Sequence, residues 1–159
     1  MSPAVTETSE SLESLLLGLL TRLEHLPGEY EQLRDGVQRL AKIADGDPEM
    51  ALTRARKILE LVIYDVYMRR FDEPSGKRDL VELIDRLFKE GQIPPLIQAN
   101  AHYVRNLGNV GTHGGGPRVT LAEVGYSLRQ LMPVIEWYVD AKQSGALDRK
   151  SDRPPQDAG

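Results

Sequence analysis

One stretch of the chain gathers side chains that could bind or cleave an anion. His102, Arg105, Asn106, Asn109 and His113 recur at helical spacing, and at about 100° per residue they fall within one arc of roughly 100°. An arginine can fork onto a phosphate, a histidine can exchange a proton near neutral pH, and an asparagine can orient either group. The stripe contains no Lys, Glu or Asp, so its composition differs from that of an ordinary solvated helix face.

Two interpretations of this stripe remain open from the residues alone. It is either a buried polar network or polar dimer interface, or a working site that binds or cleaves a phosphate. His102 and His113 lie three helical turns apart, too far to share one ion within a chain, so we expect no metal site and no cofactor. Glu60, the lone acid on its side of the preceding long helix, is a candidate ion-pair partner of Arg105.

The opposite side of the same helix is apolar and carries two glycines. Gly108 and Gly111 cost helix stability but allow a neighbouring backbone to approach closely. We therefore expect this side to be pressed against a neighbouring helix. The expected packing residues are Leu96, Ile97, Ala101, Tyr103, Val104, Leu107 and Val110.

The elements that must position these residues are helices. Every long periodic stretch has helical spacing and no strand pair is indicated, so the predicted fold class is all-α. Asp47 and Pro48 are start signals for one helix, and Thr120 with Glu123 forms a capping box for another, which Pro133 should kink. The predicted helices span residues 48–71, 78–90, 94–113 and 121–142.

The N-terminal segment, residues 11–46, has a heptad seam of apolar residues. Pro27-Gly28 interrupts the seam, which indicates two helices or one kinked rod. These helices either pack on the domain's own core or form a self-associating coiled segment. The seam residues are Leu12, Leu16, Leu19, Leu23, Leu26, Tyr30, Leu33, Val37, Leu40 and Ala44.

Length and charge limit the classes of function. The chain has 159 residues, no cysteine and a net charge of −4, which excludes disulfide frameworks and thiolate chemistry and disfavours a general nucleic-acid binder. No apolar run is long enough for a membrane span and the start lacks a secretory signal, so we expect a cytoplasmic protein. The Arg69-Arg70 and Lys77-Arg78 pairs predict a solvated helix end.

The predicted organisation is a disordered N-terminus at 1–10, the helical segment at 11–46, a helical bundle at 47–143 and a disordered, linker-like tail at 144–159. Such a tail is typical of an excised piece of a longer protein, with further domains or partners beyond it.

Residues 105–113 read R-x-x-G-N-x-x-x-H, which resembles the signature of the domain-of-unknown-function 4145 family, a bacterial group placed in the HEPN superfamily of helical domains. Residues 55–60 (ARKILE) resemble that family's R-x-x-L-E helix, and 83–87 (LIDRL) with 91–95 (GQIPP) also fit. The similarity covers about residues 48–140 and leaves residues 1–47 outside it.

The resemblance implies a HEPN-like antiparallel helical bundle that often dimerises. In active members, Arg and His from two subunits meet at the dimer seam and cleave RNA without a metal. Carried over, Arg105 would hold the scissile phosphate and His113 would act as acid or base. His102, Asn106, Asn109 and Glu60 would support them. Seven residues separate Arg105 from His113, against four to six in the active ribonucleases.

The resemblance thus implies two functions. The first is a homodimeric interaction or accessory domain of a bacterial defence or signalling protein. The alternative is a metal-independent endoribonuclease that uses Arg105 and His113 across the dimer seam, with RNA or a nucleotide as ligand.

Overall fold

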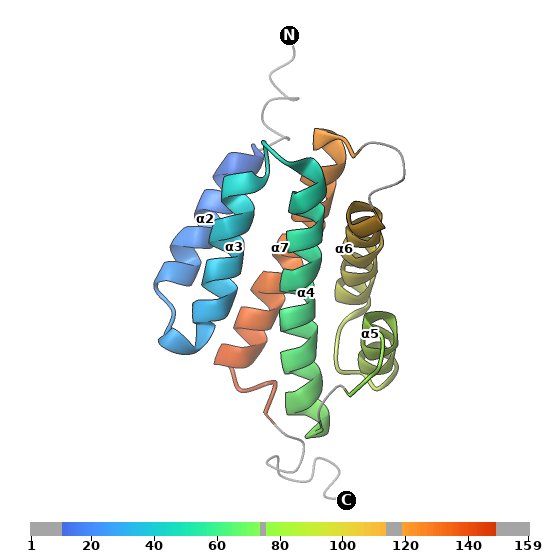
Figure 1. The fold of residues 1–159 in the computed structure, drawn as a ribbon. Helices are drawn as coiled ribbons and strands as arrows, with labels where there is room; N and C mark the ends of the chain where they lie inside the picture. Colours follow the sequence, from blue (N-terminus) through green and yellow to red (C-terminus); the bar gives the residue numbers. More distant parts are fainter. Residues whose placement is uncertain (1–10, 74–75, 114–118, 149–159) are drawn as a thin grey trace, which may run out of the picture.

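The computed structural model describes residues 11–73, 76–113 and 119–148, with only the backbone considered for residues 110–113. The described part of the chain contains helices and no strand, which confirms the all-α fold class (Figure 1). In chain order the elements are α2 (Leu12–Glu24), the 3-10 turn η1 (Gly28–Tyr30), α3 (Glu31–Ile43), α4 (Pro48–Phe71), α5 (Leu80–Lys89), α6 (Pro95–His113) and α7 (Leu121–Gln143).

The N-terminal segment forms two helices that pack on the chain's own bundle. Pro27-Gly28 ends the first helix, and η1 turns the chain back so that α2 and α3 lie side by side (Figure 1). Most of their seam residues are buried, including Leu23 and Leu33, and Leu12 and Leu26 are half-buried, because α3 packs on α4 and α2 packs on α7. An ion pair of 2.5 Å between Arg22 and Asp140 also joins α2 to α7. The heptad seam is therefore covered from within the chain.

Helix α4 is the centre of the bundle and contacts α3, α5, α6 and α7. Its start is fixed locally, because the side chain of Asp47 accepts a hydrogen bond of 3.1 Å from the backbone N–H of Met50 while Pro48 occupies the first turn. Both features favour helix initiation. The predicted bounds of this helix, residues 48–71, are confirmed.

Helices α5, α6 and α7 complete the bundle. The capping box of Thr120 and Glu123 that was expected before α7 is present. A second capping box, of Asp79 and Glu82, places the start of α5 two residues later than predicted. Helix α7 continues through Pro133 as unbroken helix. No helix of the described residues is long and apolar enough to cross a membrane.

The start of the C-terminal tail differs from the prediction. Residues 144–148 are not disordered, because Leu147 is buried and Arg70 donates hydrogen bonds to the carbonyls of Ala146 and Asp148. Arg70 also donates to the side-chain oxygen of Gln92 at 2.5 Å and is 5% exposed. The expected solvated helix end is therefore wrong for Arg70. The remaining residues of both predicted disordered ends, 1–10 and 149–159, lie outside the described part.

Candidate functional site

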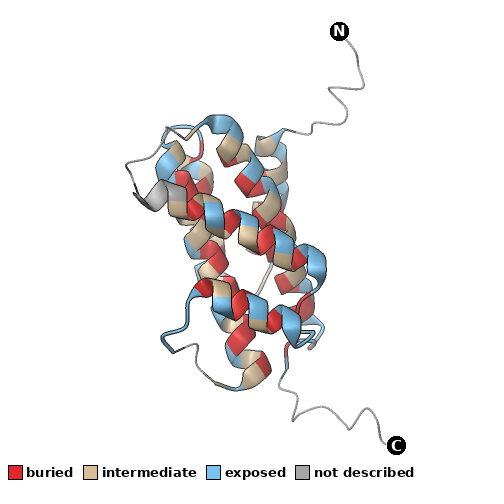
Figure 2. Cartoon of the chain, turned by 90° about the vertical axis from the view of Figure 1, so that its right-hand side faces the viewer, coloured by how far each residue is buried: buried red, intermediate tan, exposed pale blue. Residues whose placement is uncertain are grey.

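Helix α6 carries the predicted stripe and runs antiparallel to α4, with α7 on one side and α5 beside its lower half (Figure 1). Its buried residues recur turn by turn, and half-buried and exposed positions flank them (Figure 2). The flank toward α5 holds His102, Arg105 and Asn109, all half-buried, while Asn106 is exposed. The stripe thus lies along the edge of the interface that α6 makes with its neighbours.

His102 is engaged with α5. Its Nε2 atom lies 2.8 Å from Oδ1 of Asp85, and the side chain of Gln98 donates a hydrogen bond of 3.2 Å to the same oxygen. The side chain of His102 is 25% exposed. This contact ties the lower half of α6 to α5, which gives His102 a structural partner that the sequence did not identify.

Arg105 is placed differently from His102. Its Nε atom is shielded from water and has no hydrogen-bond partner. Glu60, its expected partner, is half-buried on α4, and the ion pairs of the described residues do not include one between Glu60 and Arg105. Arg105 is thus a partly covered guanidinium that has no carboxylate partner among the described residues.

At Gly108, helices α4 and α6 approach closely. A Cβ atom built on Gly108 would lie 2.5 Å from Cβ of Arg56, and 3.0 and 3.1 Å from Cδ and Cγ of the same side chain. The close packing predicted at Gly108 is therefore present, and what approaches it is the base of the Arg56 side chain. The surroundings of Gly111 and of the His113 side chain lie outside the described part, so a meeting of Arg105 with His113 stays a prediction.

The apolar side of α6 is less covered than expected. Leu96 is 66% exposed and Tyr103 is 39% exposed, whereas both were predicted to pack against a neighbouring helix. Helix α7 covers only part of this side. The ring of Tyr126 on α7 lies beside the ring of Tyr103, with 6.3 Å between the centroids, and Tyr126 is itself 60% exposed. The α6–α7 face, as we call it, comprises Leu96, Ala99 and Tyr103 of α6 and Ala122 and Tyr126 of α7.

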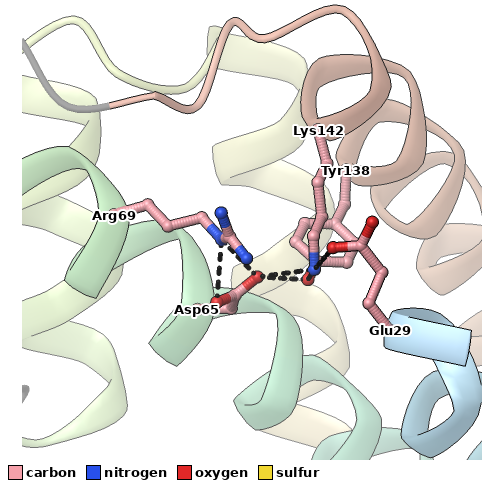
Figure 3. Close-up of polar contacts among 5 residues, drawn as sticks. All are labelled: Glu29, Asp65, Arg69, Tyr138 and Lys142. Atoms are coloured by element: carbon pink, nitrogen blue, oxygen red, sulfur yellow. Dashed lines mark hydrogen bonds and ion pairs between the residues drawn. The ribbon is translucent and has the colours of Figure 1, made fainter. Parts of the chain in front are cut away.

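A second polar cluster, which sequence reasoning missed, joins η1, α4 and α7 (Figure 3). Arg69 donates from Nε to both carboxylate oxygens of Asp65 at 3.0 Å. The hydroxyl of Tyr138 donates to Asp65 as well, and Nζ of Lys142 lies 3.4 Å from Asp65 and 3.6 Å from Glu29. Two carboxylates and two cations thus balance one another at this end of the bundle.

The environment of Asp65 favours its charged form. Burial alone would raise the pKa of Asp65, but the hydrogen bond from Tyr138 and the charges of Lys142 and Arg69 hold it below its ordinary value. Burial, followed by the hydrogen bond to Asp65, raises the pKa of Tyr138. A cavity of about 400 Å³ adjoins the cluster, with Tyr64 and residues of α3 and α4 on its other wall.

The sequence carried one signal for this cluster. Asp65 interrupts the apolar run Val62-Ile63-Tyr64-Asp65-Val66, and an acid in such a run needs a partner when the helix is central. Because Lys142 follows Tyr138 by four positions, both lie on one side of α7. Their meeting with Asp65 depends on the packing of α4 against α7, which local spacing does not reveal.

The chain matches a known protein family. Residues 38–137 match the family described as "Domain of unknown function (DUF4145)". The match begins about ten residues earlier than the resemblance did, inside α3, and includes α4, α5 and α6. No curated protein and no solved structure matched the chain. The match covers more than half of the 159 residues, and the chain therefore belongs to the DUF4145 family.

Proposed function

We propose that this chain is a HEPN-like interaction domain that forms a homodimer through the α6–α7 face. The single observation that carries the proposal is the exposure of large apolar side chains on a face without charge: Leu96 is 66%, Tyr103 39% and Tyr126 60% exposed. Such residues occur singly on many surfaces, but a contiguous group on two adjacent helices is typical of an interface.

A second copy of the chain is the partner that best fits this face. In a two-fold dimer the same patch meets itself, so a charge close to the axis would face its own copy. None of the five residues of this face is charged. The exposed charges Arg129 and Glu136, further along α7, line a pocket with Leu15 and Leu19 of α2. Tyrosines are favoured in interface centres because they bury a large ring and keep a polar hydroxyl.

Light scattering at micromolar concentration tests this proposal. The wild-type chain should have about twice its monomer mass of 17.8 kDa, and Tyr103→Lys should return it to the monomer mass because it places a charge in the centre of the face. Tyr64→Lys is the matched control, since Tyr64 on α4 is also 39% exposed but lines the cavity beside Asp65 and not the α6–α7 face. A monomeric wild type, or equal loss of mass in both variants, would refute the proposal.

A metal-independent endoribonuclease is the second candidate. The observation that favours it is that Nε of Arg105 has no hydrogen-bond partner and that Arg105 is in none of the ion pairs of the described residues, which suits a guanidinium that binds a phosphate. His113 enters only through the family resemblance. This candidate predicts RNA cleavage that survives EDTA and is lost in both Arg105→Ala and His113→Ala. Cleavage that is unchanged in either variant would remove it.

The wider setting follows from the same resemblance. We infer a cytoplasmic protein of bacterial defence or signalling in which this domain brings together further domains or partner proteins. Dimerisation by the α6–α7 face would leave the flank with His102 and Arg105 free for those partners, because the two lie on different sides of α6.

A further inference from the structure

We propose that Arg56 of α4 and Arg105 of α6 together form an anion-binding site for a phosphate group, in the seam between the two helices. The proposal does not require the dimer. It deepens the ribonuclease candidate by naming a second phosphate-binding residue, but the site can bind without cleaving.

The first observation is that both arginines carry a buried donor without an acceptor. The Nε atoms of Arg56 and Arg105 are shielded from water and have no hydrogen-bond partner. Only one other side-chain atom of the described residues, the hydroxyl of Ser127, shares this condition. A buried N–H without an acceptor destabilises a protein, so two arginines in this state on adjacent helices call for a ligand that supplies the acceptors.

The second observation is that the two side chains belong to the same seam. The Cβ, Cγ and Cδ atoms of Arg56 lie against Gly108 of α6. Arg105 precedes Gly108 by three residues, which is about 4.5 Å along the helix axis and about 60° around it. Gly108 therefore has a positional role: with no side chain of its own, it lets the stem of Arg56 reach α6 close to Arg105.

The surroundings of the site are compatible with an anion. Helix α5 lies beside the lower half of α6 (Figure 1), where Asp85 meets His102. Arg105 and Asn109 follow His102 by about one and two turns of α6. Asn109 is half-buried and adds a neutral amide. Glu60 follows Arg56 by one turn but pairs with neither arginine within 4 Å in the described part of the chain. Neither arginine therefore has a carboxylate partner within the described residues.

A phosphate is the chemical class that this site fits best. Each guanidinium presents several N–H donors in a plane, and a tetrahedral oxyanion has enough oxygen atoms to accept from two of them at once. The phosphate could belong to a free nucleotide or to an RNA backbone, and binding measurements distinguish these two sources.

The first test is thermal unfolding of the full chain with inorganic phosphate or uridine monophosphate, against sodium chloride of equal ionic strength. Saturating ligand should raise the melting temperature by about 5 °C, and Arg56→Gln or Arg105→Gln should abolish the rise. Lys57→Gln is the matched control, because Lys57 is the exposed neighbour of Arg56 on α4. Arg56→Met without phosphate should melt no lower than the wild type, which separates loss of binding from loss of folding.

The second test is fluorescence anisotropy with a labelled single-stranded RNA octamer. If the phosphate comes from RNA, each arginine variant should weaken binding at least tenfold and lower the salt dependence of log Kd by about 0.7, the value for one single-strand phosphate. Lys57→Gln should bind within about twofold of the wild type.

An arginine-dependent response in either test supports the site and identifies its source. No response to any of the three probes, or equal responses in the Lys57 control and the arginine variants, would overturn it. Both tests measure binding, and neither depends on the mass of the assembly or on RNA cleavage. A monomeric or catalytically inactive protein therefore would not decide the matter, and each proposal can fail alone.

Discussion

Gly108→Ala perturbs a close contact between α4 and α6. The added Cβ would lie 2.5 Å from Cβ of Arg56, and both atoms are fixed to their backbones, so no rotamer change relieves the overlap. The helices must separate by about 1 Å to reach ordinary carbon–carbon contact. Overpacking of this kind costs about 1–3 kcal/mol, and we expect the upper half of that range because the backbone must move.

Helix propensity acts in the opposite direction. Alanine is favoured over glycine in a helix interior by about 1 kcal/mol, so the net loss in the free energy of unfolding should be about 1–2 kcal/mol. For a chain of this length the melting temperature should fall by about 3–6 °C. Gly125→Ala on α7 is the control, because nothing lies within 4 Å of its added Cβ, and it should be stabilising by about 0.5–1 kcal/mol.

Urea unfolding of both variants measures the difference directly. A double variant, Arg56→Ala with Gly108→Ala, sharpens the test. It removes Cδ and Cγ of Arg56, which lie 3.0 and 3.1 Å from the added Cβ, but keeps Cβ of residue 56 at 2.5 Å. It should remain less stable than Arg56→Ala alone. If Gly108→Ala is as stable as Gly125→Ala, the close α4–α6 packing is refuted.

Two further predictions concern the polar contacts that the sequence did not reveal. Asp65→Asn should lower the free energy of unfolding by about 2 kcal/mol, because it leaves two partly buried cations short of a partner. Asp140→Asn removes a carboxylate that is 68% exposed and should lower the free energy of unfolding by less than about 1 kcal/mol. The pKa of Asp65 is lowered in the folded chain. Its contribution should therefore be full above its unfolded pKa of about 3.9 and disappear as the pH falls through the lower folded value, which urea titrations of wild type and variant at several pH values will show. Arg70→Met should release residues 144–148, because their carbonyls lose the guanidinium, and faster hydrogen exchange at Leu147 would report it; unchanged exchange there would contradict this role of Arg70.

The sequence predicts best where the signal is local. Asp47-Pro48 and the pair Thr120 and Glu123 act within one turn of the helix that they start, so these starts were correct. The side of α6 that carries the stripe was also predicted, because helical periodicity fixes it. How much of the opposite side is covered depends on where α7 crosses, and this is why Leu96 and Tyr103 were wrongly expected to be packed.

Contacts between distant residues were beyond local reasoning. Asp65 meets Tyr138 across 73 positions of the sequence, and Arg70 meets Ala146 across 76. Arg70 alone resembled an ordinary charge at a helix end, and Asp65, although it interrupts an apolar run, does not identify its partner. Only the packing of α4 against α7 brings the pairs together, and a charge pattern within one helix does not contain that packing.

Self-association through the α6–α7 face is the central claim, and the absence of cysteine from the chain permits a direct measurement. Ala99→Cys places a single thiol on the face, and Gln32→Cys places one on exposed α3. With a nitroxide attached to each, dipolar coupling between copies reports how close the labels of two subunits lie. We predict strong coupling at position 99 that weakens on dilution with unlabelled chain, and little at position 32. Absent coupling at position 99, or equal coupling at both positions, would contradict the dimer.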